Sequence, residues 1–189
     1  MSRSFLFAAA LAALAPAAFA EVTDGPGPNL VVQVDGQVHG TIVIDLRADL
    51  APKHVAQITA LASEGAYDGV VFHRVIDGFM AQTGDVQFGK GADLTRAGTG
   101  GSARPDLAAE FSSEPFARGV VGMARAEDPN SANSQFFIMF APAPDLDGLY
   151  TIVGNVISGM DVVDAIKRGE GRNGEVADPD RMAKVTVAP

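Results

Sequence analysis

Residues 72–85 of the 189-residue chain read FHRVIDGFMAQTGD. Apolar runs flank the dipeptide Asp77-Gly78, which favours a tight turn, so two short strands are predicted within 69–75 and 78–84. The stretch holds one Arg, one Gln and several large apolar side chains. It holds no Ser or Cys nucleophile, no carboxylate pair at a useful spacing and no metal-ligand cluster. A site built here has one cation, one amide and an apolar wall for its chemistry.

Further short strands are predicted on both sides of this stretch. Upstream, apolar residues alternate within 29–46 around a turn at Asp35-Gly36, which predicts a β-hairpin. A helix over 52–64 follows, because apolar residues recur at helical spacing between a proline suited to a first turn and a glycine suited to a stop. Downstream, apolar runs predict strands within 118–125, 135–140, 151–157 and 183–188, and a helix within 159–169.

The count of elements decides the predicted fold class. Eight short strands with two interspersed helices favour a mainly β protein, a closed eight-stranded antiparallel β-barrel whose interior is filled with side chains. The 21 glycines and 11 prolines agree with many turns and short strands. Residues 29–189 show no repeat and no internal linker, so we expect one domain.

The first twenty residues, 1–20, have the composition of a secretory signal peptide. One arginine precedes sixteen apolar residues, and residues 18–20, AFA, are a small-x-small cleavage motif. The apolar run is shorter than the about 20 residues that a membrane span needs, and no cysteine is present to be acylated. We expect cleavage between Ala20 and Glu21, a flexible tail over 21–28, and a periplasmic mature protein that has no membrane anchor.

Charge and cysteine content narrow the choice of partners. The formal net charge is −9, and without Arg3 the mature chain has 13 basic and 23 acidic residues, about −10 (13 − 23). This balance argues against nucleic-acid binding, which needs a basic surface to meet phosphates. A secreted chain with no cysteine must be held together by its core alone, which fits a bacterial periplasmic domain.

Two other patterns match binding motifs only in part. Residues 84–90, GDVQFGK, have the spacing of a phosphate-binding loop, but Gly91 stands where a Ser or Thr should bind magnesium, and no helix follows. The histidines His39, His54 and His73 are scattered without the spacing of metal ligands. We therefore expect neither a metal nor a cofactor.

Strand alternation groups side chains around the candidate site. Phe136 and Ile138 share one face of their strand, which leaves Gln135 and Phe137 together on the other. An aromatic beside one amide is what a small apolar ligand with a polar group requires. Arg74, between apolar runs, has two interpretations: an exposed strand arginine or the functional group of the site.

Residues 72–85 closely resemble the signature of the cyclophilins, in which Arg, Phe, Met and Gln stand at the same spacing. Residues 119–140, GVVGMARAEDPNSANSQFFIMF, and 146–166, LDGLYTIVGNVISGMDVVDAI, resemble later blocks of that family in the same order. The resemblance covers roughly residues 29–187, and its details are those of the family's bacterial secreted branch. It implies a cyclophilin-like barrel capped by two α-helices, with peptidyl-prolyl cis–trans isomerase activity.

The implied reaction breaks no covalent bond, so it needs no nucleophile, metal or cofactor. An X-Pro amide resists rotation with a barrier of about 18–20 kcal/mol, and in the twisted transition state its nitrogen becomes pyramidal and basic. The resemblance assigns Arg74 as the donor to that nitrogen, and Gln82 as the group that holds the substrate carbonyl and orients Arg74. The implied substrate-binding residues are Phe79, Met80, Phe137 and Leu146 around the proline ring, and Ala124, Arg125, Ala126, Gln135 and Tyr150 along the groove. Of Arg125, the resemblance implies that the backbone grips the peptide.

The implied partners are proline-containing peptides and unfolded exported proteins, bound by a monomer. Weak cyclosporin binding is also expected, because Asp145 stands where the family's Trp offers the drug an indole N–H and a flat face. Arg125 replaces a common Asn, and the connection over 86–101 is longer than the family's usual one. These departures bear on inhibitor affinity and sequence preference and leave Arg74 in place.

Two rival functions stay open at this level. A proline-binding chaperone or adaptor with little turnover would bind the same peptides, but it would not need a donor over the nitrogen, so Arg74 and Gln82 favour the enzyme. A small-ligand barrel of the lipocalin kind would need an empty interior, whereas the alternating Val, Ile and Phe are suited to filling one.

Overall fold

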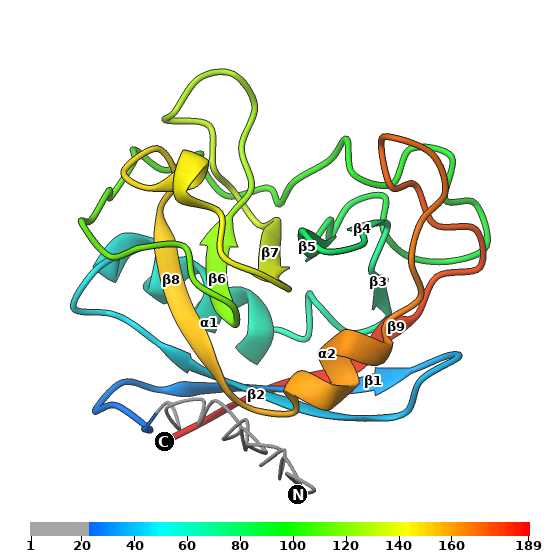
Figure 1. Cartoon of the computed structure of the whole chain (residues 1–189), viewed down its shortest axis with the longest axis horizontal. Coiled ribbons are helices and arrows are strands. Elements are labelled where there is room, and N and C mark those ends of the chain that lie inside the picture. The colour runs from blue at the N-terminus through cyan, green and yellow to red at the C-terminus, as the bar shows by residue number, and fades with distance from the viewer. Residues whose placement is uncertain (1–22) are drawn as a thin grey trace, which may run out of the picture.

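The computed structural model describes residues 23–189, which form a strongly curled antiparallel sheet with two helices (Figure 1). Within these residues the sheet has nine strands, in the order β3-β9-β1-β2-β8-β6-β7-β5-β4. The strands are β1 Asn29–Asp35, β2 Gly40–Leu46, β3 Val70–Val71, β4 Arg74–Ile76, β5 Met80–Thr83, β6 Val120–Met123, β7 Phe136–Met139, β8 Ile152–Ser158 and β9 Arg181–Ala188. The helices are α1 Pro52–Ser63 and α2 Met160–Ala165, and a 3-10 turn, η1, spans Pro144–Leu146.

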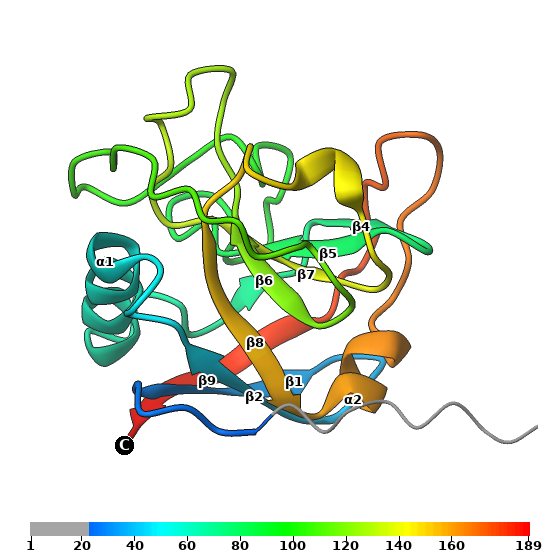
Figure 2. The ribbon, with the colours of Figure 1, turned by 60° about the vertical axis from the view of Figure 1, so that its left-hand side comes forward.

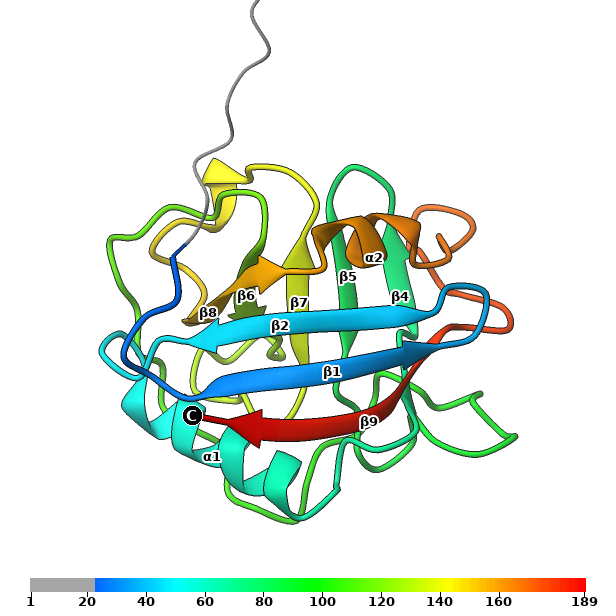
Figure 3. The same ribbon diagram turned by 90° about the horizontal axis from the view of Figure 1, so that it is seen from below.

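The two ends of the strand order are neighbours in the chain. β3 ends at Val71 and β4 begins at Arg74. Seen from below, β9, β1 and β2 cross in front of β4 to β7 (Figure 3), and β8 pairs with both β2 and β6. No ladder joins β3 to β4 in the described part of the chain, so the sheet is a curled half-barrel and not the closed barrel that was predicted.

The predicted count of eight strands is also short by one. Residues 69–75 are predicted as a single strand, but the structure splits them into β3, which pairs with β9, and β4, which pairs with β5. Between the two strands, the Phe72 N–H donates to Asp180 O at 2.8 Å instead of continuing one ladder. Alternation reports which face of a strand is buried and not which strand lies alongside, so it cannot reveal such a change of partner.

One large apolar cluster fills the interior of the curled sheet. Its fully buried side chains include Ile44 of β2 and Phe136 and Ile138 of β7. Phe137, between the last two, lies in a second and smaller cluster with Phe116, as alternation predicts. The filled interior argues against the lipocalin-like alternative, and the second cluster forms one wall of the site described below.

The two helices lie at the periphery of the sheet (Figure 2), where α1 contacts β9 and α2 contacts β2. Helix α1 ends one residue before its predicted end, whereas α2 is shorter than the predicted range 159–169. After α2 the backbone becomes extended at Ile166, and the Lys167 N–H donates to the buried Asp180 carboxylate at 2.8 Å. That bond comes from a residue 13 positions further along the chain, so the helical pattern alone could not place the end of α2.

The first described residues, 23–28, run beside β2. Pro28 O accepts the Leu46 N–H at 3.1 Å, and the Asp24 carboxylate accepts the Asn29 side-chain amide at 3.1 Å. The predicted signal peptide, 1–20, lies outside the described residues, and the flexible tail stays a prediction. Among residues 23–189, no helix is long and apolar enough to cross a membrane.

Helix α1 begins without a capping side chain of its own. Ala51 stands at its N-cap position, so the free amides of the first turn need an acceptor from elsewhere. Glu110, in the connection between β5 and β6, supplies it. Its carboxylate accepts the Lys53 and His54 amides, both at 3.1 Å, and the Nδ1–H of the buried His54 ring at 2.7 Å. These bonds fasten the β5–β6 connection to α1.

Glu110→Ala is expected to lower the free energy of unfolding by about 2 kcal/mol, because it removes hydrogen bonds to a charged group at a helix N-terminus. Burial opposes ionisation, but the hydrogen bonds from His54 and the two amides outweigh it and hold the pKa of Glu110 below its ordinary 4.5. The stabilisation by ionised Glu110 is therefore complete above about pH 4.5, and it is lost as the pH falls through the lowered pKa of the folded state. Urea unfolding at several pH values measures both effects.

The matched control is Glu114→Ala, which removes a half-exposed carboxylate from the same connection. It should change stability by less than about 0.5 kcal/mol. Equal losses in the two variants would show that Glu110 does not act as a cap.

Candidate active site

Arg74 and Gln82 lie directly opposite each other on β4 and β5. Arg74 Nη1 donates to Gln82 Oε1 at 3.1 Å, and Arg74 Nε donates to the backbone carbonyl of Asn173 at 2.9 Å. The side chain is half-buried, so two fixed bonds hold its guanidinium at a surface. Burial lowers the pKa of the adjacent His73, so this ring adds no positive charge beside Arg74 at neutral pH.

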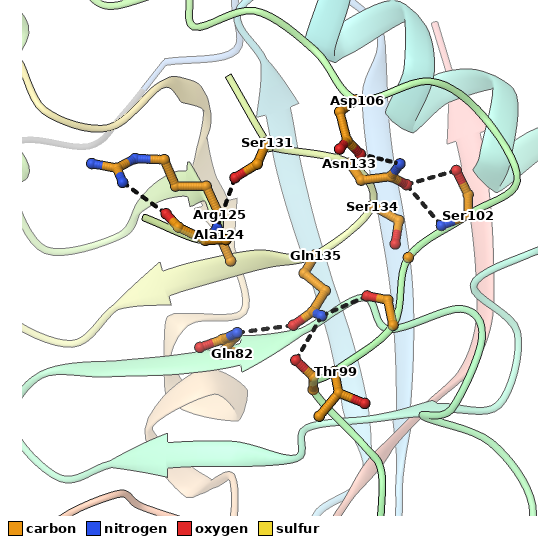
Figure 4. A pocket seen from close by; sticks show the side chains of 14 residues that line it. Gln82, Thr99, Ser102, Asp106, Ala124, Arg125, Ser131, Asn133, Ser134 and Gln135 are labelled. Atoms are coloured by element: carbon orange, nitrogen blue, oxygen red, sulfur yellow. Dashed lines mark hydrogen bonds between the residues drawn. The ribbon is translucent and has the colours of Figure 1, made fainter. Parts of the chain in front are cut away.

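Gln135 continues the chain of hydrogen bonds away from Arg74. Gln82 Nε2 donates to Gln135 Oε1 at 2.9 Å, and Gln135 Nε2 donates to the carbonyls of Gly98 and Gly100 at 3.0 and 2.8 Å (Figure 4). Because two carbonyls can only face the Gln135 NH2 group, they fix the orientation of that amide. The Gln135 oxygen must then face the Gln82 nitrogen, which leaves the Gln82 oxygen for Arg74.

An apolar cavity of about 180 Å³ opens beside the Arg74 guanidinium. Nine of the eleven residues predicted for the site line it: Arg74, Phe79, Met80, Gln82, Ala124, Arg125, Phe137, Leu146 and Tyr150. They come from β4, β5 and the turn between them, from β7, from the loop after β6 and from the segment around η1. The structure therefore gathers residues that are up to 76 positions apart (150 − 74) around one small apolar space, to which Arg74 and Arg125 add cations and Gln82 adds an amide.

Aromatic rings shape one end of this cavity. Phe137 stacks on Phe116 with ring centroids 5.9 Å apart, and Tyr150 stands edge-on to both. A Cβ at Gly122 would lie 2.6 Å from the Phe137 ring and 2.7 Å from the Phe116 ring, so only glycine fits behind them. Because the rings are already held in place, contact with a small apolar ligand does not carry the entropy cost of ordering them.

A larger and more polar cavity of about 530 Å³, whose lining side chains are drawn in Figure 4, adjoins the apolar one. Gln82, Ala124 and Arg125 line both cavities. The two remaining predicted residues, Ala126 and Gln135, line the larger one. Because they share three lining residues, the two cavities together make one groove, with Arg74 at its apolar end.

The Arg125 side chain joins the two loops that border the groove. Its guanidinium lies 4.4 Å from the centre of the Tyr150 ring and donates to the carbonyls of Ala126, Glu127 and Leu149. The resemblance implied a role only for the Arg125 backbone, so sequence reasoning missed this contact. The available signal was the arginine itself, in place of the common asparagine.

Other parts of the site were invisible to the sequence because they are backbone acceptors. Asn173 O anchors Arg74, and the carbonyls of Gly98 and Gly100 anchor Gln135. A carbonyl has the same chemistry in every residue, so no residue type marks it. The 86–101 connection, whose role was open, supplies two of these three acceptors.

Comparisons with known proteins show the family of the chain. Residues 30–187 match the family described as cyclophilin type peptidyl-prolyl cis-trans isomerase/CLD. A Brucella suis protein named as a probable peptidyl-prolyl cis-trans isomerase is 58% identical over 189 residues, which cover 98% of this chain and 95% of that protein. A peptidyl-prolyl cis-trans isomerase of Arabidopsis thaliana is 37% identical over 155 residues, which cover 78% of this chain and 90% of that protein.

Solved structures give the same result for the fold. A cyclophilin from Hirschia baltica superposes with a TM-score of 0.71 at 25% identity, over 86% of this chain and 74% of that one. A cyclophilin type peptidyl-prolyl cis-trans isomerase of Cryptosporidium parvum, crystallised in the presence of the dipeptide Ala-Pro, has a TM-score of 0.71 at 25% identity, over 85% of this chain and 99% of that one. On its sequence match and its fold, the chain belongs to the cyclophilin-type peptidyl-prolyl cis-trans isomerases, a family of isomerase enzymes.

Proposed function

We propose that this chain catalyses cis–trans isomerisation of X-Pro bonds, and that Arg74 stabilises the twisted amide. The observation that carries the proposal is a guanidinium held by Gln82 and by Asn173 O at the edge of a small apolar cavity. An uncatalysed X-Pro bond isomerises in roughly 10–100 s. A pocket for the proline ring beside one fixed donor is sufficient to shorten that time, because the reaction needs rotation only.

The proline ring occupies the apolar cavity against Phe137, in this proposal, and its nitrogen faces Arg74. Rotation takes the nitrogen lone pair out of conjugation, so the nitrogen can accept a hydrogen bond that the planar amide cannot. A donor placed there stabilises the transition state more than the ground state, which is the requirement for catalysis. Within the described residues Arg74 donates from Nε and Nη1, so others of its five N–H groups are free for this contact.

Gln82 and the loop after β6 hold the rest of the peptide. One N–H of the Gln82 amide is used by Gln135, and the second can donate to the substrate carbonyl. The amides of Ala124 and Ala126 donate within the protein, to Gln135 O and to Ser131 Oγ, both at 2.9 Å. The backbone of Arg125, between them, is the group that grips the peptide in the larger cavity.

A proline-binding chaperone or adaptor is the alternative function. It would use the same cavity but not the donor. A protease-coupled assay with an Ala-Pro peptide separates the two, since the enzyme shortens the slow phase in proportion to its concentration and the binder leaves it unchanged.

The mature protein is proposed to act in the periplasm, on unfolded exported proteins whose X-Pro bonds limit folding. Support comes from the composition of residues 1–20 and from the absence of cysteine in the chain. We expect N-terminal sequencing of the exported protein to begin at Glu21. Recovery of a chain with an intact N-terminus from the membrane fraction would contradict this localisation.

Asp145 is expected to make cyclosporin a weak inhibitor. It is exposed in η1, next to Leu146 of the apolar cavity, and the drug's apolar surface would have to desolvate its charge. Asp145→Trp should tighten inhibition by at least about tenfold, since it removes that charge and adds an apolar face with an N–H donor. Inhibition curves for the two proteins measure the change, and nanomolar inhibition of the unmodified protein would contradict it.

A further inference from the structure

The long connection over 86–101 is held by one buried carboxylate. Asp85 has no solvent exposure. Its Oδ1 accepts the amides of Gln87 and Phe88 at 3.1 and 2.9 Å, and its Oδ2 accepts the amides of Gly98 and Gly100 at 2.7 and 3.0 Å. Both ends of the connection are therefore tied to a single side chain at the end of β5.

The two glycines at the far end have their carbonyls committed as well. Gly98 and Gly100 donate their N–H groups to Asp85, and they accept the Gln135 amide with their carbonyls. Each residue thus bonds Asp85 on one side and Gln135 on the other. A shift of this segment away from Asp85 would move the two acceptors on which the orientation of Gln135 depends.

At Gly98 and Gly100 the segment lies too close to its neighbours for a larger residue. Gly98 has a φ of +93°, and a Cβ there would lie 2.8 Å from the His73 ring. A Cβ at Gly100 would lie 2.7 Å from both Asp85 Oδ1 and the Phe88 ring. These close contacts leave the backbone little room to move. The carbonyls of Gly98 and Gly100 therefore keep their positions as long as the bonds to Asp85 are intact.

We propose that Asp85 is a positioning residue for catalysis, acting on Arg74 through the 98–100 segment, Gln135 and Gln82. The inference rests on the proposed function. Every link is a hydrogen bond of 2.7 to 3.1 Å, and aligned bonds of this kind reinforce one another. Asp85 itself lies outside both cavities of the groove, so it acts without contacting the substrate.

The test compares Asp85→Asn with Asp180→Asn. Whichever way the new side-chain amide turns in Asp85→Asn, its NH2 group faces one pair of amide donors and releases one end of the connection. Asp180 is a matched control, since it is buried and accepts hydrogen bonds from the amides of Val38 and Lys167, outside the site.

We expect Asp85→Asn to lower kcat/KM by about tenfold, the effect of one misplaced hydrogen bond. Affinity for an Ala-Pro peptide should change by less than about twofold, and Asp180→Asn should leave both quantities unchanged.

A second background separates positioning from general loosening of the fold. In Gln135→Ala the chain of bonds is already broken, so adding Asp85→Asn should have no further effect on kcat/KM. An undiminished further loss in that background would overturn the inference. Wild-type kcat/KM in Asp85→Asn, or an equal loss in Asp180→Asn, would overturn it too.

A variant within the connection covers the case in which Asp85→Asn does not fold. Gly98→Ala forces a Cβ against His73 and should also lower kcat/KM, while Gly91→Ala has a comparable φ of +83° but no atom within 4 Å of its Cβ. We expect only Gly98→Ala to slow isomerisation and to shift the Arg74 Nε–H resonance in NMR spectra. Equal activity of the two glycine variants would contradict the inference.

Measuring Arg74→Ala in parallel distinguishes a failure of the role proposed for Asp85 from a failure of the proposed function. If Arg74→Ala isomerises at the wild-type rate, the proposed mechanism fails. If Arg74→Ala is slow and Asp85→Asn is not, only the role of Asp85 fails.

Discussion

Arg74→Ala is expected to lower kcat/KM for an Ala-Pro peptide by roughly ten- to a few-hundred-fold. The change removes a charge-assisted hydrogen bond made mainly in the transition state, worth on the order of 1.5–3 kcal/mol, and each 1.36 kcal/mol is about tenfold in rate. Affinity for the peptide should change far less, because the cavity wall around Phe137 and Leu146 stays in place. Isomerisation kinetics with a separate binding titration distinguish the two effects.

Arg74→Lys should restore only part of the loss. Arg74 bonds Gln82 and Asn173 O with separate nitrogens, and a single ammonium on a flexible stem cannot keep both contacts and also reach the substrate nitrogen. Circular dichroism and thermal melting must show that both variants fold. Wild-type kinetics in folded Arg74→Ala would mean that the arginine is an ordinary strand residue.

Phe137→Ala is expected to destabilise the protein strongly and to abolish tight contact with the proline ring. Phe137 is only 5% exposed and stacks on Phe116, so its truncation should lower the free energy of unfolding by about 3–5 kcal/mol. It also removes a wall of the apolar cavity, so the peptide should bind at least about tenfold more weakly. Urea unfolding and an NMR titration of the folded protein measure the two effects.

Phe136→Ala is the control next to it in the chain. Phe136 is 1% exposed and lies in the main interior cluster, on the opposite face of β7. It should lose comparable stability while the folded protein keeps its affinity for the peptide. The Leu variants of both positions serve where the Ala variants are too unstable. Equal loss of affinity in the two variants would contradict the placement of the proline ring against Phe137.

The sequence predicts the fold class and most element positions because strand alternation and helix periodicity are local patterns. It predicts β7 and the opposite faces of Phe136 and Phe137 correctly. It misses the break between β3 and β4, where Phe72 turns to Asp180 O, because a change of strand partner leaves no mark on alternation. It also misses the early end of α2, after which the Lys167 N–H bonds the side chain of Asp180, 13 residues further along the chain.

For the site, the resemblance points to the residues that line the groove but not to what holds them. The structure brings nine of the predicted residues around one cavity and two into the adjoining one, and their catalytic and binding roles stay predictions. The Arg125 side chain and the carbonyl of Asn173 were not foreseen. Such supports come from backbone atoms and from contacts across many residues, and neither has a signature in residue type.

Exchange NMR on an Ala-Pro peptide with a catalytic amount of the proposed mature chain, residues 21–189, tests the central claim most directly. Exchange between the cis and trans resonances reports turnover, and shifts of the Phe137 and Tyr150 rings in the same sample report occupation of the apolar cavity. We predict that the ring shifts are accompanied by exchange far faster than the uncatalysed roughly 10–100 s. Ring shifts with exchange at the uncatalysed rate would show that the groove binds proline without catalysis, which contradicts the proposed isomerase function and supports a chaperone or adaptor.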